Sequence, residues 1–248
     1  NLPRVTRFAS ALGQNLALFR QYQALAASAE AAHFDAAQRK VLDNTLRDFR
    51  LGGAELAPEA QQRFAAIKEE LSALSAKFSQ NVLDATDAWS LVVDDEARLA
   101  GVPDDVKAAA RVAAQKDGHE GWKLTLQMPC YLPVQTWGED RDLREILYRA
   151  SAQRASEFGD DALDNSGNID RILALRGELA ALLGFASYGD YSVATKMAQD
   201  PAEVLGFLRD LAARAKPFAA RDRADLEQFA REQLGIDSLQ AWDLAFAA

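Results

Sequence analysis

Apolar residues recur at helical spacing through the first third of the chain. Side chains three or four positions apart lie on one face of an α-helix, because the helix turns once every 3.6 residues. The first series predicts one helical face formed by Val5, Phe8, Leu12, Leu16 and Phe19. The second predicts a helix whose buried face consists of Val41, Leu42, Leu46 and Phe49.

The second predicted helix has a signal at each end. Asp35 with Gln38 three positions later is a capping-box arrangement, in which each side chain accepts a hydrogen bond from the other residue's backbone N–H. Gly52 and Gly53 supply the positive φ angles that commonly end a helix. We therefore expect a helix from about residue 35 to about residue 51.

The third predicted helix has the most regular pattern. Pro58 suits a first helical turn, where its missing N–H needs no partner. Apolar residues then follow at spacings of 3, 4, 3 and 4, at Phe64, Ile67, Leu71, Leu74 and Phe78, and the pattern continues to Val82, Ala85 and Trp89. This narrow seam must pack against partner helices, and we expect the first two helices in that role.

The pattern changes between residues 90 and 137. Leu91–Val93 predicts a short strand, and a helix is expected from Pro103 to Gln115. A strand is then indicated by the alternation of Trp122, Leu124, Leu126 and Met128 with polar residues. The proline-bracketed residues 131–137 predict a further extended segment. We interpret residues 90–137 as a small β insertion.

The remainder reads as helical. Predicted helices carry Leu143, Ile146, Leu147 and Ala150, and then Ile169, Ile172, Leu173, Leu179 and Leu182, with Gly184 as the end of the second. Asp200-Pro201-Ala202-Glu203 predicts a helix start, whereas Pro217 predicts a kink or a split, because it removes a backbone hydrogen bond. The expected fold is mainly α, a multi-helical bundle with a small β insertion. Residues 1–248 form one helical region with sub-parts 1–89, 90–137 and 138–248.

Composition narrows the classes of partner and compartment. The net charge of −9 argues against nucleic acid, because phosphate binding needs clustered Lys and Arg. No apolar run approaches the roughly 20 residues that span a bilayer, and no export signal is visible, so we expect no membrane partner. Cys130 is the single cysteine, which excludes an intramolecular disulfide and favours a reducing, cytoplasmic location. We predict that it is a structural thiol.

Two sequence patterns resemble metal sites. His119-Glu120-Gly121-Trp122-Lys123 matches four of the five positions of H-E-x-x-H, but its last position is a cation instead of a second zinc ligand. We interpret it as a chance match, with a zinc hydrolase using His119 and Glu120 as a weak alternative. His33 is expected to be exposed or to lie at a helix cap.

The second pattern resembles a calcium loop. Asp164, Ser166, Asn168 and Asp170 alternate as in such a loop, but the required glycine and terminal glutamate are replaced by Ile169 and Leu175. A helix-start cluster is the better interpretation. No nucleotide-binding motif and no hydrolase G-x-S-x-G motif occurs. We therefore predict no catalytic, cofactor-binding or metal residues in this chain.

An ordered set of short segments, from about Tyr22 to Phe246, resembles the oligopeptidase A-like branch of the thimet oligopeptidase family. The segments are Val41-Leu42-Asp43-Asn44, Leu46-Arg47-Asp48-Phe49, Phe78–Thr86, Tyr131-Leu132-Pro133-Val134, Tyr148-Arg149-Ala150, Leu175–Ala180, Leu183-Gly184-Phe185, Ser192–Ala198 and Trp242-Asp243.

The resemblance implies a zinc metallopeptidase that cleaves short peptides in a channel between two helical lobes. In that family the H-E-F-G-H helix and a glutamate ligand lie in the later half of the polypeptide, and none of them has a matching position here. The expected role is therefore a non-catalytic N-terminal channel wall. Its partners would be short peptide substrates and a C-terminal catalytic lobe that holds the zinc. The alternative is a free-standing helical protein-interaction module without enzymatic activity.

Overall fold

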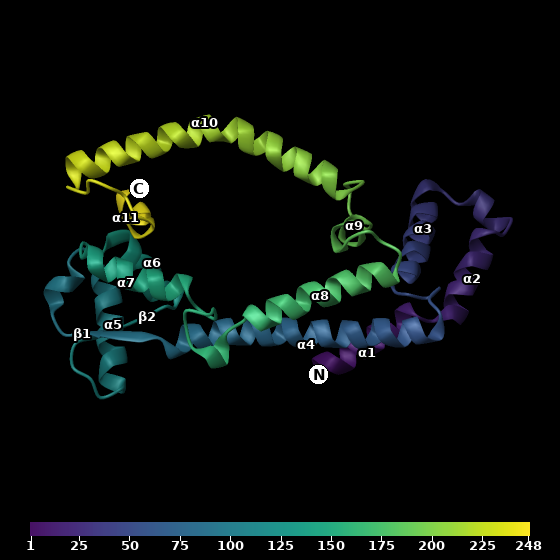
Figure 1. Ribbon diagram of the computed structural model, residues 1–248, viewed down its shortest axis with the longest axis horizontal. Helices are drawn as coiled ribbons and strands as arrows, with labels where there is room; N and C mark the ends of the chain where they lie inside the picture. Colours follow the sequence, from purple (N-terminus) through teal and green to yellow (C-terminus); the bar gives the residue numbers. More distant parts are fainter. The chain divides into compact units, whose positions relative to one another are not determined.

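The computed structural model describes residues 1–248 and is mainly helical, with one small antiparallel sheet (Figure 1). The helices are α1 (Leu2–Gly13), α2 (Leu16–Ala26), α3 (Ala36–Leu51), α4 (Pro58–Ala88), α5 (Asp104–Lys116), α6 (Met128–Trp137), α7 (Arg141–Ala152), α8 (Ser166–Leu182), α9 (Tyr188–Val193), α10 (Pro201–Gln233) and α11 (Leu244–Ala247); the strands are β1 (Ser90–Val93) and β2 (Trp122–Thr125). The predicted fold class is confirmed. No helix is long and apolar enough to cross a membrane.

The chain forms two compact units. Unit 1 comprises residues 1–78 and 167–207, and unit 2 comprises residues 79–166 and 208–248. Each unit therefore joins two separate stretches of sequence. The predicted sub-parts 1–89, 90–137 and 138–248 follow the texture of the sequence and stay a prediction.

The single face predicted from Val5 to Phe19 is wrong, because this stretch forms two helices. Asn15 interrupts the series, and its Oδ1 accepts a hydrogen bond from the backbone N–H of Leu18 (3.0 Å), which begins α2. Phe19 is buried, whereas Phe8 on α1 is 71% exposed. Apolar spacing alone does not reveal such a break, since the series continues across it.

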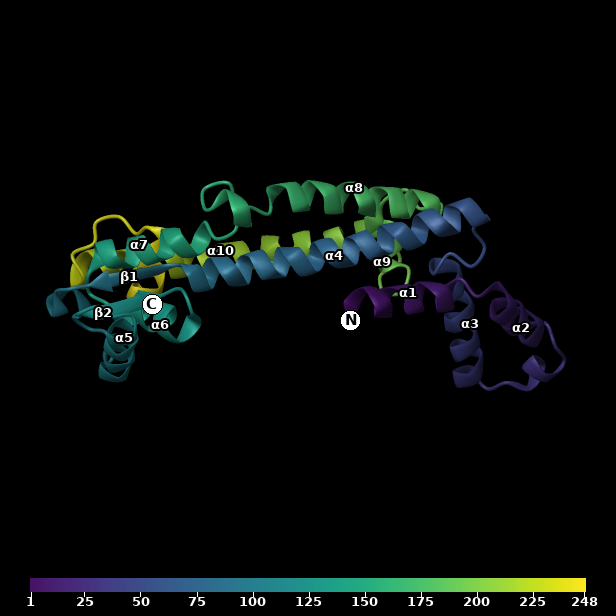
Figure 2. The same ribbon diagram turned by 90° about the horizontal axis from the view of Figure 1, so that it is seen from below.

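The capping box at the start of α3 is confirmed. The N–H of Gln38 donates to Asp35 Oδ1 (2.8 Å), and the N–H of Asp35 donates to Gln38 Oε1 (2.9 Å). Gly53 has φ +85° after the helix, as expected, but Gly52 has φ −79°. In the predicted buried face Val41 is wrong, since it is 66% exposed. Leu42, Leu46 and Phe49 pack on Phe19 of α2, which lies beside α3 (Figure 2).

The long helix predicted from Pro58 is confirmed as α4, but its main apolar partner in unit 1 is α8. Phe64 and Ile67 of α4 cluster with Leu175 and Leu179 of α8, and the two helices lie side by side (Figure 2). Of the two expected partners, α1 contacts α4 through Thr6 Oγ1, which donates to Ser72 Oγ (3.1 Å). Sequence spacing does not identify α8, because it lies about a hundred residues further along the chain.

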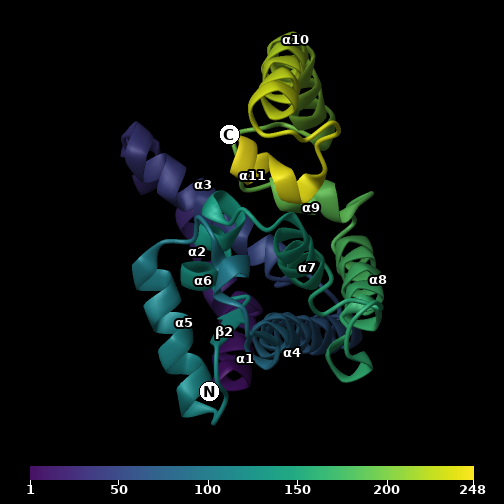
Figure 3. The same ribbon diagram turned by 90° about the vertical axis from the view of Figure 1, so that its left-hand side faces the viewer.

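The small β insertion of unit 2 is confirmed as the pair β1–β2, with Leu91 opposite Leu124 and Val93 opposite Trp122. Trp122 and Leu124 are buried in the core of this unit, where α5 lies beside β2 (Figure 3).

The extended segment predicted for residues 131–137 is wrong, and Met128 is not a strand residue. Both belong to α6, in which Met128 is exposed. Pro129 is in the first turn, where a missing N–H is harmless. Pro133 removes one hydrogen bond within the helix, and burial of Val134 offsets that loss.

The predicted helix start at Asp200 is confirmed, because Asp200 Oδ1 accepts from the N–H of Glu203 (2.7 Å) at the start of α10. The predicted split at Pro217 is absent, since α10 is one helix from Pro201 to Gln233. The helix around Pro217 is exposed, so the carbonyl group that lost its partner remains open to water. In α7, Leu143 and Leu147 are buried as predicted, whereas Ile146 is exposed.

Candidate functional site

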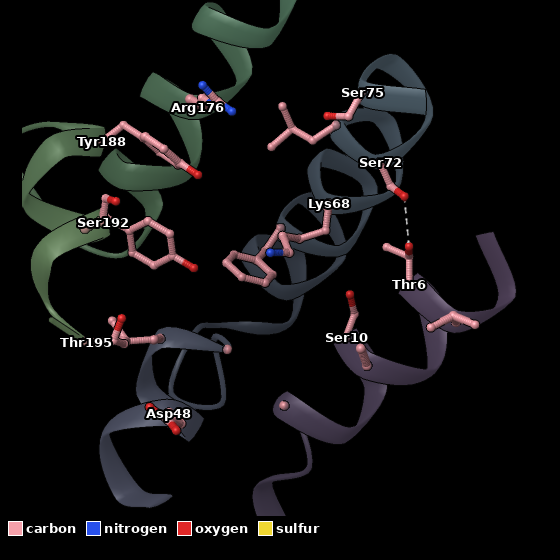
Figure 4. Close-up of a pocket in the computed structure, with 18 of the residues that line it drawn as sticks. Thr6, Ser10, Asp48, Lys68, Ser72, Ser75, Arg176, Tyr188, Ser192 and Thr195 are labelled. Carbon is pink, nitrogen blue, oxygen red and sulfur yellow. Dashed lines mark hydrogen bonds between the residues drawn. The ribbon is translucent and has the colours of Figure 1, made fainter. Parts of the chain in front are cut away.

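Unit 1 contains a pocket of about 890 Å³, lined by residues of α1, α3, α4, α8 and α9 (Figure 4). This volume lies within the range of about 300–1,000 Å³ that is typical of ligand pockets. The labelled polar residues of the lining are Thr6, Ser10, Asp48, Lys68, Ser72, Ser75, Arg176, Tyr188, Ser192 and Thr195.

Helical spacing on α4 brings polar and apolar groups to the same wall. Phe64, Lys68, Leu71, Ser72 and Ser75 are three or four positions apart, so they share one face. Phe64 is buried among apolar residues of α8, whereas Lys68 is half-buried at the pocket. The seam that packs the long helix therefore also carries a cation.

Two tyrosines from the short helix α9 face the pocket. Ser187 caps this helix by accepting from the N–H of Asp190 (3.2 Å), and the spacing then places Tyr188 and Tyr191 on one face. Their ring centroids lie 5.6 Å apart, and the guanidinium carbon of Arg176 lies 5.0 Å from the centroid of the Tyr188 ring. Figure 4 shows both tyrosines across the pocket from Lys68.

The pocket has an excess of positive charge although the chain is acidic. Its lining includes Lys68, Arg176 and Lys196, against the single carboxylate of Asp48. Asp48 pairs with Arg47 (2.8 Å), and Lys196 Nζ donates to the hydroxyl of Ser192 (2.9 Å). Lys68 and Arg176 form no ion pair.

Acidic residues near this surface are bound to arginines outside the lining. Arg63 and Glu178 form a bidentate pair at 2.6 Å, and Arg171 pairs with Glu70 at 2.6 Å. The hydrogen bond from Arg171 lowers the pKa of Glu70 below its ordinary value, and the opposing effect of desolvation is smaller. These carboxylates are therefore ionised and already paired.

Burial raises the pKa of Tyr191, and the neighbouring Tyr188 adds to that effect. Tyr191 therefore stays protonated at neutral pH, so its hydroxyl can donate a hydrogen bond. The arrangement offers unpaired cations, hydroxyl donors and aromatic faces to one ligand.

Unit 2 contains a second group of charges, buried instead of exposed in a pocket. Arg144 is 1% exposed and Asp243 is 0% exposed, and Arg144 Nη2 donates to Asp243 Oδ1 (3.0 Å). Arg141 Nη2 donates to the other carboxylate oxygen (2.7 Å), and Arg144 Nη1 donates to the carbonyl of Gly138 (2.7 Å). The cluster joins α7 to the turn before α11, so we assign it a structural role.

Burial by itself would raise the pKa of Asp243. The hydrogen bonds from Arg141, from the backbone of Gln240 and from Arg144 outweigh burial and hold that pKa below its ordinary value.

The residues of the incomplete H-E-x-x-H match do not share a helical face. His119 and Glu120 lie in an exposed turn between α5 and β2, and Lys123 in β2 pairs with Asp117. His33 is exposed in unit 1, as expected, whereas His119 belongs to unit 2. No three His, Cys, Asp or Glu side chains converge as metal ligands, so the donors of this chain do not fit a zinc site. That it contributes no catalytic or metal residues stays a prediction.

The other patterns noted in the sequence have local roles. Asp164 Oδ1 accepts from the N–H of Ser166 (2.9 Å) and from its hydroxyl (2.8 Å) at the start of α8, which supports the helix-start interpretation. Cys130 is half-buried, and burial raises the pKa of its thiol. It therefore stays protonated, in agreement with a structural role.

The pocket residues were not among the sequence predictions. A signal was present in Lys68, which stands four positions after the buried Phe64, on the seam of α4. Tyr188 and Tyr191 gave no comparable signal, because the pocket depends on helices that are distant in sequence.

Comparison with known proteins identifies relatives along the whole chain. Residues 135–248 match the model of peptidase family M3. Oligopeptidase A of Escherichia coli is 46% identical over 247 residues, and that of Haemophilus influenzae is 45% identical; each alignment covers 99% of this chain and 36% of the relative. The dipeptidyl carboxypeptidase of Salmonella typhimurium is 32% identical over 235 residues, which are 94% of this chain and 34% of that protein.

The chain thus spans about a third of the length of these relatives. The similarity to the oligopeptidase A branch extends beyond the segments noted in the sequence to almost every part of the chain. The predicted resemblance is confirmed, and the chain belongs to peptidase family M3 as an oligopeptidase A-like sequence.

Proposed function

We propose that this chain is a non-catalytic, channel-wall region of a zinc-dependent oligopeptidase that hydrolyses short peptides. The observation that carries the proposal is the uninterrupted similarity to proteins named oligopeptidase A over 247 residues. The alignments cover only 36% of those proteins, which leaves most of their length for the catalytic machinery.

The chemistry of the side chains supports this division. Hydrolysis by zinc-activated water needs three convergent protein ligands and a general base. The two histidines of this chain are exposed and belong to different units, and neither has a second metal ligand beside it. The proposal therefore assigns the zinc to a C-terminal catalytic lobe outside this chain.

The helices of unit 1 suit a wall that binds peptides. α4 and α8 are joined by an apolar cluster and by two ion pairs, so the face that carries the pocket is well packed. A rigid support of this kind holds binding groups in position. Short peptides are the proposed substrates, and a cytoplasmic location is part of the proposal.

Activity and metal content test the proposal directly. The 248-residue chain and the product of its complete reading frame would be assayed with an internally quenched peptide, with and without a zinc chelator, and analysed for metal. We expect no cleavage and no bound zinc in the chain, and chelator-sensitive cleavage with about one zinc in a product that contains H-E-x-x-H.

Two outcomes would contradict this proposal. One is a reading frame without H-E-x-x-H, and the other is chelator-sensitive cleavage by the 248-residue chain. In the second case, loss of metal on His119→Ala would identify the zinc hydrolase considered in the sequence.

The exposed apolar side chains favour a second candidate, a free-standing helical interaction module. Val5 and Phe8 on α1 and Phe207 and Phe218 on α10 are all more than 60% exposed, and a helix that exposes large apolar residues is suited to a protein partner. A reading frame that ends at Ala248, with a stable and inactive product, would support this function over the first.

A further inference from the structure

We propose that the unit 1 pocket binds a carboxylate group of a short peptide through Lys68, assisted by Tyr191 and Arg176. The inference rests on the proposed function for the nature of the ligand, since peptides are the substrates proposed there. It goes beyond that function by naming the chemical group that the wall recognises and the residues that recognise it.

The first support is the charge of the pocket. Lys68 is half-buried and forms no ion pair, and Arg176 contacts only the face of the Tyr188 ring. A cation that is partly removed from water and has no anionic partner is costly until an anion approaches it. The nearby acids Glu70 and Glu178 cannot serve, because Arg171 and Arg63 already hold them.

The second support is the set of hydrogen-bond donors. Both carboxylate oxygens can accept more than one hydrogen bond, so a carboxylate suits an ammonium group flanked by hydroxyls. Figure 4 shows Lys68 facing the α9 side of the pocket, from which Tyr188, Tyr191 and Ser192 project. The protonated hydroxyl of Tyr191 can donate a hydrogen bond beside the ammonium group of Lys68.

The third support is the character of the remaining lining, which suits a peptide better than a small inorganic anion. The lining combines apolar residues such as Val5 and Leu71 with the tyrosine rings and with serine and threonine hydroxyls. Aromatic and apolar surfaces accept side chains, and the hydroxyls can bond to backbone amides. The volume of about 890 Å³ is much larger than one carboxylate requires.

Calorimetric titration of the 248-residue chain with three blocked or unblocked pentapeptides tests this inference. The peptides are acetyl-Ala-Ala-Glu-Ala-Ala-amide, its Gln counterpart, and the Gln counterpart with a free C-terminal carboxylate. We expect at least one of the two peptides with a carboxylate to bind about ten- to a hundredfold more tightly than the neutral one, as for a charge-assisted hydrogen bond. The two charged peptides distinguish a side-chain carboxylate from a terminal one.

Variants locate the binding group. Lys68→Met is expected to remove the preference, Lys68→Arg to retain most of it, and Tyr191→Phe to weaken it about three- to tenfold. The matched control is Lys77→Met, which removes the same charge nine residues further along α4. At about 100° per residue this position lies on the opposite face, and it is not part of the lining. Circular dichroism would verify that each variant is folded.

Three outcomes would overturn the inference. These are equal affinity for charged and neutral peptides, equal losses in Lys68→Met and Lys77→Met, and tighter binding of inorganic phosphate than of any peptide. The assay needs neither zinc nor cleavage. If it fails while the product of the complete reading frame still shows zinc-dependent cleavage, only this inference is lost and the proposed function stands.

Discussion

The two units use charged residues in opposite ways. In unit 2, Arg144 and Asp243 are almost completely buried, and each charge has a partner. In unit 1, Lys68 and Arg176 line an open pocket and have no carboxylate partner, while the carboxylates around them pair with other arginines.

This difference separates charges that hold the fold from charges available to a ligand. A buried pair contributes order only while both members remain, since loss of one leaves the other uncompensated in a medium of low polarity. A half-buried cation beside a pocket keeps part of its water and can exchange it for a ligand. Substitutions in the two places should therefore affect different quantities.

The largest expected effect is at Asp243. Asp243→Asn leaves the charge of Arg144 buried without its carboxylate, and we expect the free energy of unfolding to fall by about 3–5 kcal/mol. All four tryptophans, Trp89, Trp122, Trp137 and Trp242, belong to unit 2, so tryptophan fluorescence in a urea titration reports on this unit.

The matched control is the exposed ion pair between Asp210 and Arg214 on α10. Asp210→Asn should change the free energy of unfolding by no more than about 1 kcal/mol. Equal effects of the two substitutions would refute the structural role assigned to the buried cluster.

A somewhat smaller effect is expected in the apolar core of unit 1. Leu175 is fully buried between α4 and α8, and Leu175→Ala should cost about 2–5 kcal/mol through lost contacts and a cavity. Leu173 on the same helix is 60% exposed, so Leu173→Ala should stay within about 0.5 kcal/mol. Hydrogen exchange of the α4 and α8 amides measures both. A small cost at Leu175 would show that apolar packing does not dominate this unit.

Acid should weaken unit 2 through the same carboxylate. The pKa of Asp243 is lower in the folded chain than its ordinary value of 3.8, so the unfolded chain binds the proton more readily. The stabilisation is therefore complete above about pH 4 and is lost as the pH falls through the lower folded pKa. Urea midpoints followed by tryptophan fluorescence between pH 6 and pH 3 should fall less steeply in Asp243→Asn than in the unaltered chain. Parallel curves would exclude Asp243 as a source of the acid sensitivity.

The smallest effect on stability is expected at the pocket. Lys68→Met removes a cation without an ion-pair partner, so the free energy of unfolding should change by about 0.5 kcal/mol or less, as in Lys77→Met. Thermal unfolding followed by circular dichroism measures the change. A loss of several kcal/mol in Lys68→Met alone would place Lys68 with the structural charges and remove the contrast between the units.

Local sequence signals determined most helix starts and the class of the fold. Asp35 with Gln38 and Asp200 with Glu203 begin helices as predicted, because capping depends on groups within one turn. Alternation likewise identified the buried Trp122 and Leu124. These signals work because the atoms that interact are only a few residues apart.

Local signals failed where burial by a distant segment outweighs propensity. α6 forms across Pro133, and Asn15 divides a continuous apolar series into α1 and α2. The partner of α4 was incomplete for a related reason, since α8 follows it only after a long intervening segment.

The sequence by itself determined a mainly helical chain, its helix caps and its relationship to oligopeptidase A. Only the tertiary structure decided that Lys68 and Arg176 share one pocket with Tyr191, and that Arg144 and Asp243 form one buried cluster. The physical reason is that capping and periodicity act within a few residues, whereas a pocket or a buried ion pair requires groups from separate helices. Such groups meet only when the apolar faces of those helices pack together.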